Sequence, residues 1–431
     1  MGQHSNISIE QLALQRNRYR HLSDEEWRWF LQQVEGRERT ADKLPTFAAI
    51  DDWWYPVRLS CEQCSSELTA RYKAQIVLGT SSLSTSSLGT CLDLTGGYGV
   101  DTFFLSERFA HTDYVEQNAE LCRIAEHNFN LPRNQVPSTK GHITVHNCAA
   151  EEFLSSPLYG GIEGGLGGYH LIFLDPARRN CHGGKVFRLA DCTPNVIELL
   201  PTLFDHLAPN GRILLKLSPM LDITQALKEF SLVHGTSSLG SLSWDVHIVA
   251  VKNEVKEVLL LSRNSDISKY RDTEPTITTL DLSHPEQAFT FTREEEQDTA
   301  LPPFEGRVGV GFAGFGVFLY EPNAAILKAG AYKLIAQRFE LRKLDTNTHL
   351  YVSDTLVENF PGRVWRIKEA PFQLSPKGAR DKQANVLCRN YPLTPEQLKK
   401  KLRLRDGGSA FVIGCRVAGK PAVFLAERVL S

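Results

Sequence analysis

The sequence contains no long apolar run. Nowhere in its 431 residues do about 20 apolar residues follow one another, which is the length that a membrane-spanning helix requires. The first residues, Met1 to Glu10, are mostly polar and lack the apolar core of a signal peptide. We therefore expect no association with a membrane and a cytoplasmic location.

A regular cysteine framework is also absent. The nine cysteines are scattered, and an odd number cannot all pair within one chain. Cys61 and Cys64 are close enough in sequence for a zinc or redox site, but no second pair accompanies them. Two incidental reduced thiols are the favoured interpretation, and we expect no bound metal.

The chain as a whole has no strong net charge, but two parts of it carry net charges of opposite sign. The formal net charge is −2, yet residues 321–431 hold 20 lysines and arginines against 10 acidic residues, whereas residues 1–320 hold 28 against 40. A basic end on an acidic body is the arrangement expected when one part captures a polyanion and the other part does chemistry. A solvated charged surface is the alternative.

Shifts in composition divide the chain into four parts. Residues 1–75 have a helical pattern. Residues 76–265 alternate short apolar runs with amphipathic segments, which predicts an α/β domain. Residues 266–320 lose this periodicity, and we expect a linker or a small irregular unit. Residues 321–431 combine helical and strand patterns and are expected to form a small α+β domain.

Local signals place several elements at the two ends of the chain. Ser23 is expected to cap a helix, and the aromatic run Trp53 to Tyr55 is expected to pack the N-terminal layer on a sheet, with a base-stacking surface as the alternative. Pro322 is expected to open a helix that reaches about Phe339. Thr394 begins a capping box, and a closing hairpin turns at Ala418 and Gly419. Strands are expected at Leu350 to Val352, Val364 to Lys368 and Ala384 to Cys388.

A glycine-rich turn follows a strongly apolar strand-like segment. The run is Asp93 Leu94 Thr95 Gly96 Gly97 Tyr98 Gly99 Val100 Asp101, and an amphipathic helix comes after it. A strand that turns directly into a helix leaves backbone N–H groups unpaired, and glycine lets a ligand approach them closely. Glu116 follows about 20 residues later, where the next strand of a βαβ unit presents an acid to ribose hydroxyls. The order of these parts predicts a nucleoside site.

The glycine spacing of dinucleotide-binding proteins is missing from this turn. Aligned on the acid, the pattern Asp93-x-Thr95-x-Gly97-x-Gly99 resembles motif I of class I S-adenosylmethionine-dependent methyltransferases, with Thr95 where many members have their first glycine. The resemblance implies a Rossmann-like α/β fold with a seven-stranded sheet, and S-adenosylmethionine as the cofactor. The residues implied to contact the cofactor are Asp93, Thr95, Gly96, Gly97, Gly99, Asp101, Glu116, Gln117, Cys148, Ala149 and Asp175.

Two of these assignments depend on less regular positions. After the strand expected at His142 to Val145 the family often has an acid, whereas this chain has an amide and a thiol, so Cys148 and Ala149 would contact adenine through backbone groups. The segment before the glycine turn supplies Ser65, Ser66 or Lys73 as a possible ligand of the methionine carboxylate, with simple packing as the alternative.

A second motif ends another buried strand. The run His170 to Arg179 finishes in Asp175 and Pro176, a rigid polar break at the strand end where ligands of open α/β sheets gather. It occupies the position of the family's motif IV. Asp175, Pro176 and Arg178 are the predicted catalytic residues, and Arg178 and Arg179 are expected to hold phosphate.

The C-terminal part resembles a THUMP-like domain. The runs Tyr320 to Ile326 and Phe360 to Arg363, the basic helix and the terminal hairpin are similar to the domain that follows the catalytic domain in a bacterial family of RNA methyltransferases. This resemblance implies an RNA partner. The residues expected to contact RNA from the basic helix are Lys399, Lys400, Lys401 and Arg403.

The sequence therefore predicts an S-adenosylmethionine-dependent RNA methyltransferase. Methyltransferases that act on exocyclic amines commonly have two prolines and an aromatic residue after the motif IV acid, but here Asp175 is followed by one proline and no aromatic residue. We expect transfer to another base position of tRNA or rRNA. The alternatives are a non-catalytic cofactor-binding RNA-binding protein and a small-molecule methyltransferase. The sequence indicates neither the modified atom nor the oligomeric state.

Overall fold

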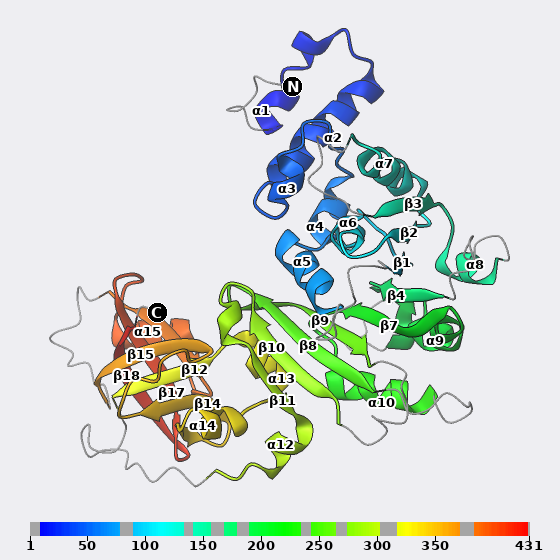
Figure 1. The fold of residues 1–431 in the computed structure, drawn as a ribbon. Helices are drawn as coiled ribbons and strands as arrows, with labels where there is room; N and C mark the ends of the chain where they lie inside the picture. Colours follow the sequence, from blue (N-terminus) through cyan, green and yellow to red (C-terminus); the bar gives the residue numbers. More distant parts are fainter. Residues whose placement is uncertain are drawn as a thin grey trace. The chain divides into compact units, whose positions relative to one another are not determined.

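This computed structural model describes residues 9–77, 89–132, 141–156, 168–178, 189–233, 243–263, 274–301, 317–370 and 383–429 (Figure 1). The predicted phosphate ligand Arg179 lies outside these ranges. Within them, no helix has both the length and the apolar character needed to span a bilayer.

The N-terminal part is helical, as predicted. Its elements are α1 (Ile9–Ala13), η1 (Arg16–Tyr19), α2 (Asp24–Thr40), α3 (Pro45–Ala48), α4 (Arg58–Gln63) and α5 (Glu67–Ile76). Ser23 caps α2 in a capping box with Glu26, which confirms the predicted start of that helix.

Aromatic side chains pack this helical layer on the domain that follows it. The Trp53 indole stacks on Phe47 at 4.1 Å between ring centroids and donates a hydrogen bond to the Tyr98 hydroxyl (2.9 Å). Trp53 and Tyr55 are buried, as expected. Trp54 is only half-buried and stacks on the His127 ring. The layer is therefore part of the same core as the glycine turn.

A nine-stranded sheet carries the glycine turn, with strand order β11-β10-β8-β9-β7-β4-β1-β2-β3. The strands are β1 (Thr90–Asp93), β2 (His111–Val115), β3 (His142–His146), β4 (Tyr169–Leu174), β7 (Leu207–Leu217), β8 (Trp244–Val251), β9 (Glu254–Ser262), β10 (Thr276–Asp281) and β11 (Phe289–Thr292). The neighbours from β7 through β4, β1 and β2 to β3 are parallel. β1 and most of β4 are buried on both faces, and accordingly β4 is largely apolar and the two middle residues of β1, Cys91 and Leu92, are apolar.

Helices and short elements connect these strands. The helices are α6 (Val100–Ser106), α7 (Ala119–Phe129), α8 (Ala150–Ser155), α9 (Val196–Asp205) and α10 (Ile223–Val233). The short elements are β5 (Ala177–Arg178), η2 (Leu189–Asp191) and β6 (Cys192–Thr193), and β5 pairs with β6.

The seven strands that the resemblance implies are present, but the sheet continues beyond them. Lys252 and Asn253, both at positive φ, form the tight turn between β8 and β9. The two further strands, β10 and β11, come from the segment that was expected to be a linker. The described part of that segment also contains η4 (Pro285–Gln287) and α12 (Arg293–Asp298), so it is not irregular, and the prediction was wrong there.

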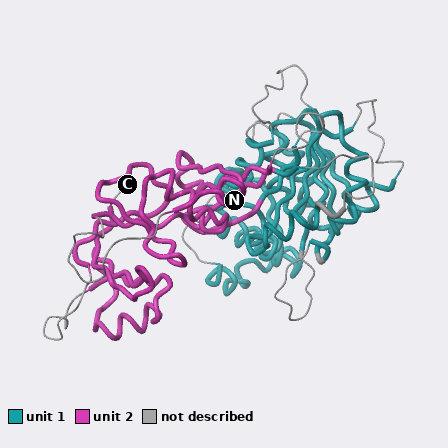
Figure 2. The backbone as a smooth tube through the Cα atoms, turned by 90° about the horizontal axis from the view of Figure 1, so that it is seen from below, with its two compact units in different colours: residues 1–244, 259–273 teal, residues 245–258, 274–431 magenta. Residues whose placement is uncertain are grey.

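The chain divides into two compact units, which Figure 2 colours separately. One unit contains residues 1–244 and 259–273, and the other contains residues 245–258 and 274–431. This division differs from the expected four parts, because the N-terminal helices belong with the glycine turn and the last strands of the large sheet belong with the C-terminal part.

The C-terminal part forms a seven-stranded sheet of order β13-β14-β12-β15-β18-β17-β16. Its elements are β12 (Phe318–Pro322), α13 (Ala324–Ala329), α14 (Leu334–Arg338), β13 (Arg342–Asp345), β14 (Thr348–Ser353), β15 (Gly362–Glu369), β16 (Asn385–Arg389), α15 (Pro395–Leu402), β17 (Ala410–Val417) and β18 (Lys420–Arg428). The three predicted strands, the capping box at Thr394 and the closing hairpin are confirmed. Trp365 and Phe424 are buried in the core of this sheet.

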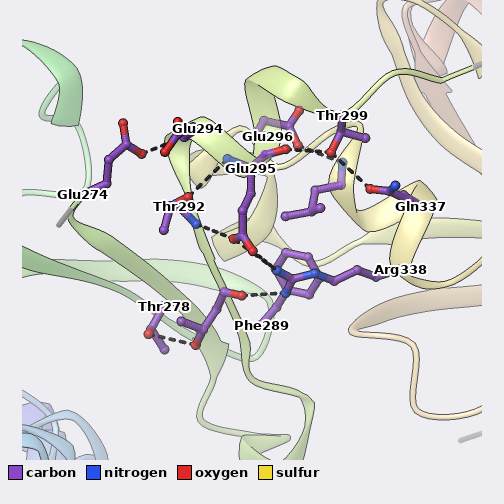
Figure 3. A network of polar contacts seen from close by, with 12 residues as sticks. Glu274, Thr278, Phe289, Thr292, Glu294, Glu295, Glu296, Thr299, Gln337 and Arg338 are labelled. Carbon is purple, nitrogen blue, oxygen red and sulfur yellow. Dashed lines mark hydrogen bonds and ion pairs between the residues drawn. The ribbon is translucent and has the colours of Figure 1, made fainter. Parts of the chain in front are cut away.

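The single helix expected from Pro322 to Phe339 is not formed. Pro322 instead ends β12, and Asn323 caps the short helix α13 through the N–H of Ile326. Gly330 then ends α13 in the left-handed conformation (φ +80°), which favours glycine. The second helix, α14, begins beside α12, whose neighbourhood is shown in Figure 3.

Candidate functional site

Asp93 fixes the start of the glycine turn. It ends β1 and is fully buried, and its Oδ1 accepts the N–H of Thr95 (3.0 Å) while its Oδ2 accepts the Thr102 hydroxyl (2.6 Å). Burial raises the pKa of Asp93 to about 7, against the opposing effect of these two hydrogen bonds. In this structure both carboxylate oxygens are therefore engaged within the turn that they shape.

The three glycines of the turn differ in what surrounds them. A Cβ at Gly96 would lie 2.1 Å from the Tyr114 ring, and one at Gly99 would lie 2.6 Å from the Phe129 ring. Gly97 has φ +55°, yet the nearest atom to a Cβ there would be the Thr95 carbonyl oxygen, at 3.8 Å. Gly97 is thus the position where the backbone is open to a ligand.

Glu116 lies against this open backbone. Its Oε2 accepts the N–H of Gly97 (2.9 Å), and its Oε1 accepts the N–H of Asn118 (2.8 Å). The Tyr114 hydroxyl donates to the Gly97 carbonyl (2.6 Å) and so fixes the same turn. The acid at the end of the second strand and the glycine turn therefore meet, as the sequence predicts.

The residues predicted to contact adenine lie next to Glu116. The Asn147 side chain donates to the carbonyls of Glu116 (3.0 Å) and Gln117 (3.2 Å). Cys148 is half-buried, and Ala149 occupies the N-cap position of α8. Gln117 is exposed beside them. The donor set and the open glycine backbone fit a nucleoside ligand.

Asp101, at the start of α6, is held by side chains from the segment before the glycine turn. It forms an ion pair with Lys73 (3.1 Å), which is fully buried, and it accepts the Ser65 hydroxyl (2.7 Å). Burial raises the pKa of Asp101, but Lys73 and Lys216 outweigh burial and hold it below its ordinary value. Ser65 and Lys73 thus bind Asp101 and lock α5 onto α6, while Ser66 caps α5.

Asp175 is the polar group at the end of β4. Its backbone N–H donates to the Thr95 hydroxyl (2.6 Å), and its Oδ2 lies 2.5 Å from Nζ of Lys216 on β7. The Asp175 side chain is 38% exposed, so a group of a bound substrate could reach its carboxylate. After Pro176, Ala177 and Arg178 form β5, and the Arg178 backbone pairs with Cys192.

Lys216 is a residue of the site that was not predicted from the sequence. Nothing local marks it, because a lysine near a strand end is common, and only the parallel pairing of β4 with β7 brings it to Asp175. Asp93, Asp175 and Lys216 come from β1, β4 and β7, three adjacent parallel strands, and they gather at the carboxyl ends of these strands.

The thiols Cys61 and Cys64 form local hydrogen bonds. Cys61 donates to the Pro56 carbonyl (3.5 Å), and Cys64 donates to the Cys61 carbonyl (3.2 Å). Burial raises the pKa of Cys61 to about 12, so this thiol stays protonated at neutral pH. Throughout the described ranges, no group of three or more His, Cys, Asp or Glu is placed to hold a metal ion.

The predicted basic surface lies on α15 and the residues after it. Lys399 is half-buried and forms an ion pair with Asp406 (2.7 Å). Lys400, Lys401 and Arg403 are exposed. With the exposed Arg405, they give α15 and the residues that follow it four exposed cations.

Comparison with known proteins agrees with this fold. Residues 318–361 match the model of a ferredoxin-like domain, and residues 362–428 match that of a THUMP-like domain. A crystal structure from Porphyromonas gingivalis W83, provisionally named a methyltransferase, is 29% identical with a TM-score of 0.75, and the match covers 95% of this chain and 92% of that one.

A second similarity is weaker. A Listeria monocytogenes structure, provisionally named a class I S-adenosylmethionine-dependent methyltransferase, is 13% identical with a TM-score of 0.39 over 64% of this chain and 80% of that one. A similarity at that level supports no further argument. No curated protein matches the chain. The match to the Porphyromonas gingivalis structure along almost the whole chain, together with the matched C-terminal domain, supports a methyltransferase with a C-terminal THUMP-like domain.

Proposed function

We propose that the protein transfers a methyl group from S-adenosylmethionine to RNA, at a base position other than a typical exocyclic amine. The observation that carries this proposal is the contact between the Glu116 carboxylate and the open backbone of Gly97. In nucleotide-binding βαβ units, an acid at this position binds the ribose hydroxyls, and the glycine turn beside it lets the ligand approach the backbone closely.

The residues around the glycine turn would hold the cofactor. Glu116 would accept hydrogen bonds from the ribose, Gln117, Cys148 and Ala149 would border the adenine, and Gly97 would allow the close approach. The engagement of Asp93 and Asp101 within the protein supports an indirect role for both, in which they shape the turn. When bound, S-adenosylmethionine supplies an electrophilic methyl group on a sulfonium, so the protein has mainly to position the acceptor.

The chemistry at the acceptor depends on Asp175. Its carboxylate is half-exposed and would accept a hydrogen bond from the target base, while Arg178 and Arg179 would hold phosphate. One proline and no aromatic residue follow Asp175. The stacking ring typical of enzymes that methylate exocyclic amines is therefore missing from the motif, which favours a ring nitrogen or another position.

RNA as the substrate is supported by the C-terminal part. A THUMP-like domain suggests RNA binding, and the exposed cations of α15 supply positive charge for a phosphate backbone. The net charge of residues 321–431 has the same sign.

Two measurements test this function. Calorimetry should show binding of S-adenosylmethionine that Glu116→Ala weakens at least about tenfold, because a charged hydrogen bond is lost. Glu120→Ala is the matched control, since Glu120 lies on the adjacent helix α7 and its carboxylate accepts hydrogen bonds from the Arg123 guanidinium. Labelled cofactor should then transfer its methyl group to RNA from cells that lack the protein, and mass spectrometry of the nucleosides identifies the product.

Asp175→Ala separates the remaining possibilities. We expect it to abolish methyl transfer while cofactor and RNA binding persist. If the wild-type protein binds RNA and cofactor but never transfers a methyl group, it is a non-catalytic binding protein. If activity is found on small molecules and survives deletion of residues 321–431, the RNA assignment is wrong.

A further inference from the structure

Asp175, whose carboxylate is proposed to face the substrate, is held from two sides, at its backbone N–H by Thr95 and at its carboxylate by Lys216. We infer that Thr95 and Lys216 are positioning residues that fix Asp175 at the end of β4, Thr95 through the backbone and Lys216 through the side chain. The inference rests on the proposed methyl transfer, in which Asp175 contacts the acceptor.

Thr95 extends the contact between β1 and β4 beyond the ends of the strands. The ladder between these parallel strands continues with the Leu94 N–H, which donates to the Phe173 carbonyl (3.1 Å). At the next step the Asp175 N–H has a side chain as its acceptor, the Thr95 hydroxyl at 2.6 Å. Thr95 is itself held by Asp93. A glycine, which many methyltransferases have at this position, has no side chain to make this bond. Thr95 therefore provides an acceptor for the Asp175 N–H that a glycine would lack.

Lys216 holds the Asp175 carboxylate from β7, the strand that pairs with β4 on the side away from β1. Leu174 on β4 is in register with Leu215 on β7, so the residues that follow, Asp175 and Lys216, lie side by side. The Lys216 side chain is 12% exposed, and its ammonium lies 2.5 Å from Asp175 Oδ2. A largely desolvated ammonium makes a stronger and better defined contact than a surface lysine does.

Lys216 is also part of a row of alternating charges. Its positive charge lowers the pKa of Asp101, whose direct partner is the buried Lys73. The order Lys73, Asp101, Lys216, Asp175 therefore alternates in sign and links α5, α6, β7 and β4. Asp175 needs such support because Pro176 follows it and has no N–H to continue the strand pairing.

Fixed placement of Asp175 matters because methyl transfer depends on alignment. A displacement of about 1 Å at a reacting group can cost about a hundredfold in rate. If Thr95 and Lys216 position Asp175, their loss should lower kcat by about 10- to 100-fold and leave the KM for S-adenosylmethionine within about threefold.

Hydrogen exchange tests the role of Thr95 without any reference to activity. In the full-length protein, Thr95→Val should speed exchange of the Asp175 amide at least about tenfold, because its acceptor is gone, whereas Thr95→Ser should keep the protection. Thr112→Val on β2 is the control, since the buried Thr112 hydroxyl has no hydrogen-bond partner among the described residues. Equal exchange of this amide in wild type and Thr95→Val would overturn the role of Thr95.

A double-mutant cycle tests Lys216. Unfolding of wild type, Lys216→Met, Asp175→Asn and the double variant should show a coupling of about 5- to 30-fold in the unfolding constant. Lys256→Met, which removes an exposed ion pair with Glu254, should show no coupling to Asp175→Asn. Additive effects for Lys216 and Asp175 would sink the assignment of Lys216. Neither test depends on methyl transfer. If the wild-type protein transfers no methyl group, the proposed function is wrong, but the support of Asp175 by Thr95 and Lys216 can still be confirmed or refuted.

Discussion

Asp113 shows how single side chains stabilise the catalytic sheet away from the cofactor turn. It lies on β2 and is buried, and its Oδ1 accepts from His146 (2.7 Å) and His111 (3.2 Å) while its Oδ2 accepts from the Tyr169 hydroxyl (2.8 Å). Burial raises the pKa of Asp113, but these hydrogen bonds outweigh burial and hold it well below its usual range. The same contact raises the pKa of His111.

Asp113→Asn should therefore destabilise the protein in a pH-dependent way. The contribution of Asp113 is present above its unfolded pKa of about 3.9 and is lost as the pH falls through its lower folded pKa. The contribution of His111 is present below its unfolded pKa of about 6.5 and is lost as the pH rises through its higher folded pKa. We expect a loss of about 1–3 kcal/mol near pH 5.5 that shrinks near pH 9, with solvent screening at the partly exposed His111 favouring the lower end.

Urea unfolding at these two pH values measures the effect. Thr112→Val, at the neighbouring position, should change the free energy of unfolding by less than about 0.5 kcal/mol, because no described partner of its hydroxyl is lost. A destabilisation by Asp113→Asn that grows from pH 5.5 to pH 9 would contradict the assigned role of His111.

At the scale of elements, the start of α14 is determined by a side chain from another helix. Glu296 on α12 is 9% exposed, and its carboxylate accepts the N–H groups of Tyr332 (3.0 Å), Lys333 (2.9 Å) and Leu334 (2.8 Å). Two further contacts link these helices, the Thr299 hydroxyl to Gln337 and Arg338 to Glu295 (Figure 3). A carboxylate at a helix N-terminus satisfies amides that the helix leaves unpaired.

Glu296→Ala should lower the free energy of unfolding by about 2–4 kcal/mol, because three backbone amides, of which that of Leu334 is buried, lose a charged acceptor. Glu296→Gln, which keeps one oxygen, should be intermediate. Glu294→Ala, at an exposed site on the same helix, should stay within about 0.5 kcal/mol. Chemical denaturation followed by circular dichroism measures all three, and equal effects of Glu294→Ala and Glu296→Ala would refute the capping role.

At the scale of the whole molecule, charge is divided between the body and the basic end. If the exposed side of α15 binds RNA, reversing Lys400, Lys401, Arg403 and Arg405 to glutamate should weaken binding and reduce the slope of log affinity against log salt by about 3 to 4. Filter binding or fluorescence anisotropy between 50 and 200 mM salt, typical conditions for such a test, gives the slope. Lys256→Glu is the control, because Lys256 is an exposed lysine on β9 and not on α15. An unchanged slope would remove α15 from the RNA surface.

Much of the site could be predicted because its signals are local. The glycines at positions 97 and 99 have the positive φ that a turn between strand and helix requires, and Glu116 meets that turn because the βαβ unit fixes the distance between them. The helix cap at Ser23 and the capping box at Thr394 also formed as predicted, since each is closed by hydrogen bonds over three residues. Such patterns are complete within one element or one unit of the fold.

The predictions that failed depend on contacts between distant parts of the chain. The helix expected from Pro322 to Phe339 is divided because Gly330 adopts a left-handed conformation and Glu296 caps the second piece. The segment expected to be a linker supplies β10, because pairing with β8 satisfies the backbone hydrogen bonds of this strand. The alternation of polar and apolar residues in the segment was too short to predict a strand.

The sequence by itself determined the glycine turn, the acid that meets it, the strand that ends in Asp175 and the positive charge of the C-terminal part. Only the tertiary structure decided which side chains hold Asp175 at the end of that strand. Lys216 reaches Asp175 over 41 residues and Thr95 reaches it over 80, because β7 and β1 are the two neighbours of β4. The physical reason is that backbone preferences act over a few residues, whereas ion pairs and buried hydrogen bonds form wherever strand order brings their partners together.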